Sequence, residues 1–233
     1  MTKNVWITGA SSGIGRALAI KFASEGWQVA ASARRENLLQ ELNKDNPKIH
    51  SFPLDVTDGS LCKKVFNNIV EKFQIIDICV FCTGIHDPQS EKKISEEKIR
   101  EIMEVNFFGT LNCIMAVNIY FREKQSGHIS IVSSVAGYRG FPAASGYCAS
   151  KAALTSLAES LYFDFKRYNV RVSLISPGFI KTPMTDKNKF PMPMIKSPEY
   201  AAEKMFIGLT KQNVFEIHFP KTLTMIMKLL KII

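Results

Sequence analysis

Residues 4–22 read NVWITGASSGIGRALAIKF, an apolar run followed by a loop with three glycines and the start of a helical pattern. Glycine permits a tight turn and lets a ligand approach the backbone closely. The N-terminus of the helix offers unpaired amides and a partial positive charge to an anion such as a pyrophosphate. This order predicts a dinucleotide-binding turn, with an ordinary glycine turn as the alternative. The loop residues predicted to bind are Gly9, Ser11, Ser12, Gly13, Ile14 and Gly15.

Short apolar runs rich in β-forming residues recur along the chain, and helical patterns fill most of the gaps between them. The runs cover residues 4–8, 27–33, 48–54, 75–83, 128–133, 170–176 and 214–219. This alternation predicts an α/β chain, a single-domain Rossmann fold over residues 1–233 with a doubly wound parallel sheet of about seven strands and helices on both faces. Such sheets bind ligands beyond the carboxyl ends of their strands, so the residues after the runs should converge on one crevice.

The composition is that of a folded soluble chain. Hydrophobic residues make up 46% and charged residues 22%, without a low-complexity tract, which excludes a disordered protein. The sequence shows neither the apolar region and cleavage site of a signal peptide nor an apolar stretch as long as a membrane span. We therefore expect a cytoplasmic protein.

The net charge of +9 favours anionic partners, such as phosphates, acyl-carrier proteins, acidic lipids or nucleic acid. The basic residues are scattered, and neither a zinc-finger spacing nor an aromatic-rich RNA-binding signature is present. We expect no nucleic-acid partner.

Cys79 and Cys82 form the C-x-x-C pattern of redox and zinc sites. They lie in the predicted strand 75–83, where residues three apart point to opposite faces and are separated by about 10 Å. That separation is too large for a disulfide. We interpret the five cysteines as core thiols in a reducing compartment and expect no metal site.

The second predicted strand ends at Ala33, and Arg34 and Arg35 follow it. A site for NAD usually has an acidic residue here that holds the ribose 2′-hydroxyl, whereas the extra phosphate of NADP calls for arginine. We predict NADP(H) as the cofactor. Asp55, after the third strand, is placed to accept a hydrogen bond from the adenine amino group; its alternative role is to cap the following turn together with Asp58.

Tyr147 and Lys151 lie four residues apart, a spacing that places both on one face of a helix. A phenol normally titrates near pKa 10, and a neighbouring cation favours its charged form. Such a pair can give or take a hydroxyl proton, although an isolated pair is more often simply solvated.

The glycine loop, Ser134, the Tyr147–Lys151 pair and Pro177-Gly178 occur in this order over nearly the whole chain, which closely resembles the short-chain dehydrogenase/reductase family. The resemblance implies that Ser134 holds the substrate oxygen and Tyr147 transfers the proton. It also implies that Lys151 tunes the tyrosine and binds the nicotinamide ribose, while Asn106 holds a proton-relay water. These four residues are the predicted catalytic set.

Further cofactor contacts follow from the resemblance. The matching positions are Val56, Thr83, Gly84, Pro177, Gly178, Ile180 and Thr182, together with Tyr147 and Lys151. Family members commonly have Asn-Asn-Ala-Gly after the fourth strand, where this chain has Phe81-Cys82-Thr83-Gly84. We expect another side chain, such as that of Thr83, to brace the sheet there.

The resemblance also implies that residues 183–198 form a mobile cover over the substrate site. They contain three methionines and a phenylalanine, which make an adaptable apolar surface. With Tyr138 and Phe141, this segment favours a hydrophobic carbonyl or alcohol over a sugar; the alternative is that its apolar side chains only pack the cover onto the domain.

Residues 221–233 predict a basic amphipathic helix. Lys221, Thr224, Lys228 and Lys231 follow helical spacing on one narrow face, and apolar residues cover the rest. The helix is too short to span a bilayer. It could pack on protein, contact an anionic membrane surface as a peripheral attachment, or line a lipid site.

Together these features favour an NADP(H)-dependent carbonyl reductase or alcohol dehydrogenase with a small, hydrophobic substrate. One alternative is a 3-oxoacyl reductase that acts on acyl-carrier-protein or coenzyme A thioesters. Alternatives of another class are a non-catalytic NADP-binding regulatory protein and a membrane-surface protein. The family resemblance implies a homodimer or homotetramer.

Overall fold

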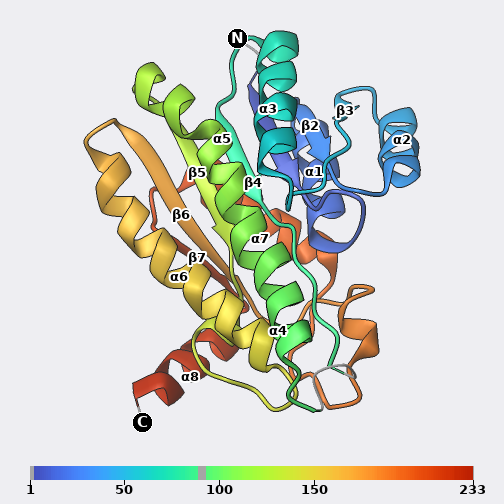
Figure 1. Ribbon diagram of the computed structural model, residues 1–233, viewed down its shortest axis with the longest axis vertical. Helices are drawn as coiled ribbons and strands as arrows, with labels where there is room; N and C mark the ends of the chain where they lie inside the picture. Colours follow the sequence, from blue (N-terminus) through green and yellow to red (C-terminus); the bar gives the residue numbers. More distant parts are fainter. Residues whose placement is uncertain (1–2, 89–92, 233) are drawn as a thin grey trace.

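The computed structural model describes residues 3–88 and 93–232. Seven parallel strands form one sheet in the order β3-β2-β1-β4-β5-β6-β7 (Figure 1). The strands are β1 (Asn4–Thr8), β2 (Gln28–Ser32), β3 (Ile49–Ser51), β4 (Ile78–Phe81), β5 (Gly127–Val132), β6 (Val170–Pro177) and β7 (Glu216–Phe219). The predicted fold class, a doubly wound parallel α/β sheet of seven strands, is confirmed.

The helices lie on both faces of the sheet. They are α1 (Gly13–Ser24), α2 (Glu36–Asp45), α3 (Gly59–Phe73), α4 (Glu96–Met103), α5 (Gly109–Lys124), α6 (Ser145–Lys166), α7 (Pro198–Lys211) and α8 (Lys221–Ile232). Shorter turns are the π-helical η2 (Glu104–Phe108) and the 3-10 helices η3 (Val135–Gly137) and η4 (Thr185–Lys187). Figure 1 shows α3, α5 and α6 in front of the sheet and α1 and α7 behind it.

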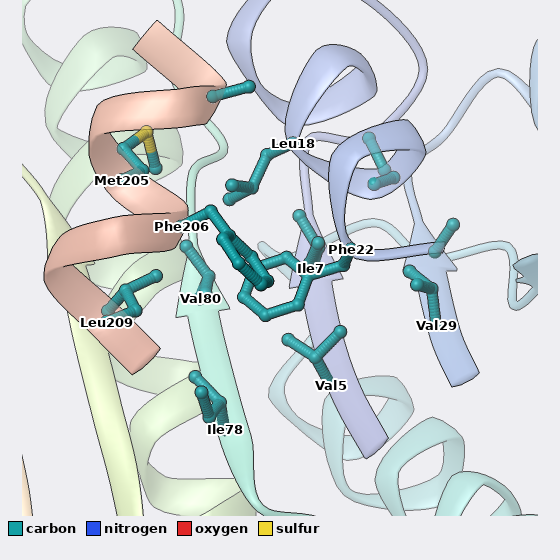
Figure 2. Close-up of a cluster of buried hydrophobic side chains, with 14 of the residues drawn as sticks. Val5, Ile7, Leu18, Phe22, Val29, Ile78, Val80, Met205, Phe206 and Leu209 are labelled. Atoms are coloured by element: carbon teal, nitrogen blue, oxygen red, sulfur yellow. The ribbon is translucent and has the colours of Figure 1, made fainter. Parts of the chain in front are cut away.

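The core behind the sheet fixes α1 against the end of β1. Phe22 of α1 stacks edge-on against Phe206 of α7, with ring centroids 5.0 Å apart. Figure 2 shows these rings meeting the side chains of β1 and β4. The labelled residues of this cluster are Val5, Ile7, Leu18, Phe22, Val29, Ile78, Val80, Met205, Phe206 and Leu209. Because this packing is tight, the loop between β1 and α1 is held at a defined place.

The core in front of the sheet is built on Trp6, which points to the face opposite Val5 and Ile7. Its ring lies between Phe66 and Phe81, with centroids 5.5 and 5.6 Å away. Its indole N–H donates to Ser32 Oγ at 2.9 Å. β1 is therefore buried on both faces, as expected for a central parallel strand.

One helical stretch is long and apolar enough to cross a membrane by length and composition. It covers Glu96–Lys124, and 44% of its apolar window is buried inside the molecule. Cys113, Val117 and Phe121 within it belong to the front core. The packing of this stretch against the sheet and α3 accounts for its apolar character.

All five cysteines are free thiols, and four of them are buried. Cys82 is the half-buried one, and desolvation of its thiol raises its pKa to about 11. In the described part of the chain, no three His, Cys, Asp or Glu side chains are grouped to hold a metal ion.

The sequence left open which side of the predicted amphipathic helix faces the protein, and the structure places α8 with part of its polar stripe inward. Thr224 is fully buried, and Lys228 turns toward the domain, where it pairs with Glu216. Lys221 and Lys231, the other two members of the polar stripe, are exposed. The outward side is largely apolar, because Thr224 and Lys228 face the domain together with Leu223 and Met227. Residue 233 of the predicted helix lies outside the described residues.

Candidate active site

A cleft of about 530 Å³ lies beyond the carboxyl ends of the strands. Every predicted site residue except Asn106 lines it. From the cofactor set these are Gly9, Ser11, Ser12, Gly13, Ile14, Gly15, Arg34, Arg35, Asp55, Val56, Thr83, Gly84, Pro177, Gly178, Ile180 and Thr182, and from the catalytic set Ser134, Tyr147 and Lys151. Seven separate stretches of sequence therefore meet in one place, and six of them lie at or after strand ends, where such sheets bind ligands.

The glycine loop is shaped by contacts that exclude side chains. Gly9 and Gly13 have φ values of +70° and +54°, a region that favours glycine. A Cβ on Gly15 would lie 2.4 Å from the carbonyl oxygen of Gly9. Helix α1 begins with no side-chain cap and no acidic residue in its first turn. Its free amides therefore fit the pyrophosphate of a dinucleotide.

Arg35 folds over the glycine loop. Its guanidinium donates to Ser11 Oγ at 2.9 Å and to Ser12 Oγ at 2.7 Å. Arg34 is exposed and lies 3.9 Å from a carboxylate oxygen of Asp55. Two cations thus stand at the end of β2, where a 2′-phosphate would sit.

Asp55 lines the cleft and also shapes the turn before α3. Its Oδ1 accepts hydrogen bonds from the amide and the hydroxyl of Thr57, at 3.0 and 2.9 Å. Asp58 is the residue that caps α3, since its carboxylate accepts from the amide of Leu61 at 2.8 Å. Asp55 therefore stabilises the turn that follows it, which was the alternative role considered for it, and it also lines the cleft.

The brace at the end of β4 comes from Thr8. Its hydroxyl oxygen accepts from the amide of Cys82 at 3.1 Å. The sequence called for another side chain to brace the sheet here, with Thr83 as the example, and in the structure the hydroxyl of Thr8 takes this role. Thr8 ends the neighbouring strand β1, so its hydroxyl is already next to the β4 backbone.

Lys151 is a buried cation, only 4% exposed. Its Nζ donates to the carbonyl oxygen of Val132 at 2.9 Å and lies 5.7 Å from the centroid of the Tyr147 ring. Burial lowers the pKa of its ammonium from 10.5 to about 8, an effect that the nearby Cys82 thiol opposes. The ammonium is therefore charged at neutral pH and close to titration.

Asn106 lies in η2, behind the cleft wall. Its Oδ1 accepts from the amide of Ile85 at 2.7 Å, and its Nδ2 donates to the carbonyl of Ile85 and to Ser150 Oγ, both at 3.0 Å. A Cβ on Gly84 would lie 3.4 Å from Asn106 Oδ1 and 3.5 Å from Lys151 Nζ. Asn106 thus pins the segment after β4 next to the lysine.

Ser134 follows β5 and begins η3, where its Oγ accepts from the amide of Ala136 at 3.1 Å. Tyr147 is half-buried near the start of α6. The ring of His86 stacks on the Tyr147 ring, with centroids 4.5 Å apart and planes inclined by 31°. Sequence reasoning missed His86; its place in the loop that follows β4 was the available signal.

The predicted cover contributes residues to the cleft wall. Pro183, Met184, Thr185 and Lys187 line it. Lys187 Nζ lies 3.5 Å from Asp87 Oδ2, so the cover is paired with the segment that carries His86. Phe190 packs on Phe179, with ring centroids 6.1 Å apart. The ion pair between Lys187 and Asp87 was not predicted, because it joins segments that are distant in the sequence.

Comparison with known proteins agrees with this geometry. The model of the family described as short chain dehydrogenase matches residues 3–212. An uncharacterized oxidoreductase of Myxococcus xanthus is 33% identical over 231 residues, covering 97% of this chain and 91% of the relative. The 3-oxoacyl-[acyl-carrier-protein] reductase FabG of Thermotoga maritima is 36% identical over 185 residues, or 78% of this chain and 75% of the relative.

Two solved structures share the whole architecture. A short-chain dehydrogenase from Streptomyces avermitilis superposes with a TM-score of 0.88 at 25% identity, covering 100% of this chain and 93% of the other. ElxO with NADP bound superposes with a TM-score of 0.82 at 25% identity, covering 94% of this chain and 98% of the other. The chain therefore belongs to the short-chain dehydrogenase family and is an oxidoreductase that uses a nicotinamide cofactor.

Proposed function

We propose that the protein is an NADP(H)-dependent reductase of a hydrophobic ketone or aldehyde, working in the cytoplasm. The observation that carries the proposal is the placement of Tyr147, Ser134 and the buried ammonium of Lys151 in one cleft with the glycine loop. A hydroxyl donor, a proton donor and a cation are what carbonyl reduction needs at the oxygen.

The chain's own residues handle the oxygen of the substrate. When bound, NADPH supplies the hydride. Ser134 donates a hydrogen bond to the carbonyl oxygen, and Tyr147 gives it a proton from its hydroxyl. The Lys151 ammonium stabilises the phenolate that remains. Asn106 holds the backbone after β4 in place and, by family resemblance, positions the water through which the proton is restored.

The choice of NADP(H) over NAD(H) rests on the end of β2. Arg34 and Arg35 stand there without an acidic residue at position 33. Guanidinium groups suit a 2′-phosphate better than a bare ribose hydroxyl. The solved ElxO structure with NADP bound supports the same choice.

The hydrophobic substrate is proposed from the cover over the cleft. Met184 lines the cleft itself, and Phe190 and Met194 are exposed on the outer part of the cover. A second candidate is 3-oxoacyl-thioester reduction, favoured by the Thermotoga maritima relative and by the charge of +9, which suits acidic acyl carriers. A non-catalytic NADP-binding role would not need the intact Ser134, Tyr147 and Lys151 set.

A homo-oligomer is proposed from the exposed face of α5 and α6. Met115, Ile119 and Phe163 are 52%, 65% and 71% exposed. Glu159 and Lys166 are exposed on the same helix as Phe163. A surface that combines apolar side chains with both acidic and basic residues suits a self-complementary contact between two copies.

A substrate panel tests the proposal. Consumption of NADPH, and separately of NADH, is followed with hydrophobic ketones, aldehydes and 3-oxoacyl thioesters. Turnover of simple hydrophobic carbonyls is expected; turnover confined to thioesters would favour the second candidate. Cofactor binding without any turnover would favour the non-catalytic role. Equal affinities for NADP and NAD would contradict the role given to Arg34 and Arg35.

A further inference from the structure

Helix α8 turns an apolar surface away from the molecule. Met225, Ile226, Leu229 and Leu230 are 57%, 46%, 60% and 40% exposed. Their spacing places them together on one side of the helix, which we call the α8 outer face. Figure 1 shows α8 at the C-terminal extremity, set apart from the helices that cover the sheet. We propose that the α8 outer face docks the protein onto an anionic lipid bilayer.

The inner side of α8 is anchored, so the outer face is already formed before docking. Leu223 and Met227 are buried in a cluster with Val135 and Tyr138. Lys228 pairs with Glu216, whose carboxylate also accepts from the hydroxyls of Tyr138 and Ser176. These contacts fix the rotation of the helix about its axis, and a bilayer would not need to order it.

Charge on α8 selects an anionic surface. The helix contains no acidic residue. Lys221 and Lys231 are exposed near its two ends, and Arg139 donates to the carbonyl of Leu230 from the neighbouring turn. An apolar stripe between basic residues is the pattern that lies in the boundary between headgroups and acyl chains, with its cations beside anionic headgroups.

A second copy of the chain suits the α8 outer face less well. Two α8 helices paired about a two-fold axis would bring the lysines of one copy toward the lysines of the other, with no acidic residue on the helix to offset them. The exposed apolar face of α5 and α6 carries both signs of charge and is the better surface for a second copy. The occupant of the α8 outer face is therefore assigned to lipid.

Docking through α8 would leave one helix, about 10 Å across, between the bilayer and the cleft wall at Gly178. A Cβ on Gly178, which lines the cleft, would lie 2.7 Å from Leu223 Cδ2. The buried side of α8 therefore backs the cleft wall directly.

The test is flotation of the full chain with phosphatidylcholine vesicles made with and without phosphatidylglycerol, at low and high salt. Binding to the anionic vesicles is expected, and it should weaken as salt rises because exposed charges are screened. The double variant Ile226→Ser/Leu229→Ser should bind the anionic vesicles roughly tenfold less or weaker still, since it removes the exposed apolar surface. The matched control, Ile94→Ser/Val214→Ser, removes two exposed apolar side chains outside α8 and outside the face of α5 and α6, and it should bind them as the wild type does.

Thermal unfolding and molar mass in solution are measured for the same proteins. The proposal is overturned if the wild type does not bind anionic vesicles, or if it binds neutral vesicles equally well. It is also overturned if the Ile226→Ser/Leu229→Ser variant binds anionic vesicles as strongly as the wild type does. A second copy of the chain would cover the α8 outer face if the wild type bound no vesicle and the variant had a lower molar mass in solution than the wild type. That result would also overturn the proposal. Flotation requires no turnover, so its outcome is separate from that of the substrate panel.

Discussion

The glycine loop before α1 and the helix α8 lie at opposite ends of the chain, and each was predicted from a local sequence pattern. The loop forms as predicted, with its glycines in the required conformations and its arginines beside it. Helix α8 forms over nearly the predicted residues, but its pattern left open which side faces the protein, and in the structure Lys228 is turned inward and Leu229 outward. The conformation of a glycine loop is determined by the residues of the loop itself. Which face of a helix is buried depends instead on the residues that pack against the helix.

The partners of α8 include residues far away in the sequence, since Val135 and Tyr138 pack against Leu223 and Met227, and a nearer one, Glu216. Glu216 accepts from Ser176 at 2.8 Å and also pairs with Tyr138 and Lys228. Burial alone would raise the pKa of the Glu216 carboxyl, but the hydrogen bonds from Lys228, Tyr138 and Ser176 outweigh it and lower that pKa from 4.5. This polar cluster, together with the burial of Leu223 and Met227, determines which side of α8 faces the protein.

The largest expected effect is in the glycine loop. Gly15→Ala places a Cβ 2.4 Å from a backbone oxygen that cannot move without displacing the loop. We expect a loss of about 1–3 kcal/mol in the free energy of unfolding and a fall in cofactor affinity of about a hundredfold. Chemical denaturation and cofactor titration measure these two quantities.

Gly140→Ala is the matched control, because a Cβ there meets nothing within 4 Å. It should leave both quantities unchanged or raise stability slightly. If Gly15→Ala behaved as Gly140→Ala does, the claim that local backbone geometry determines the cofactor end would be wrong.

A smaller effect is expected at the α8 end. Glu216→Gln leaves the half-buried ammonium of Lys228 without its carboxylate and should lower the free energy of unfolding by about 1–2 kcal/mol at neutral pH. Because the folded pKa of Glu216 is depressed, its contribution is present above pH 4.5 and is lost as the pH falls through the folded value. Denaturation of wild type and variant across this pH range measures the difference.

The control is Glu203→Gln, which removes a more exposed partner of Lys21. This change should cost less than about 0.5 kcal/mol, because surface ion pairs contribute little. An effect of Glu216→Gln no larger than that of Glu203→Gln would show that the polar cluster does not hold α8.

The sequence allowed prediction of the sheet, the glycine loop and most of the cleft lining, since these follow from strand order and from turns at strand ends. It did not allow prediction of the Thr8 brace, the stacking of His86 on Tyr147 or the pairing of Lys187 with Asp87. Each of these contacts joins residues far apart in the chain. They depend on how the strands and loops are brought together in space, which no local pattern encodes.

The most direct test of the central claim is the rate of NADPH-dependent reduction in Tyr147→Phe, with the best carbonyl substrate of the panel. Tyr162→Phe is the matched control, because Tyr162 lies exposed on the same helix. If Tyr147 gives the proton, its variant should lose about 10²–10⁴-fold in rate while NADPH binding and the control variant stay at wild-type level. A Tyr147→Phe enzyme that reduces the substrate as fast as the wild type would contradict the account.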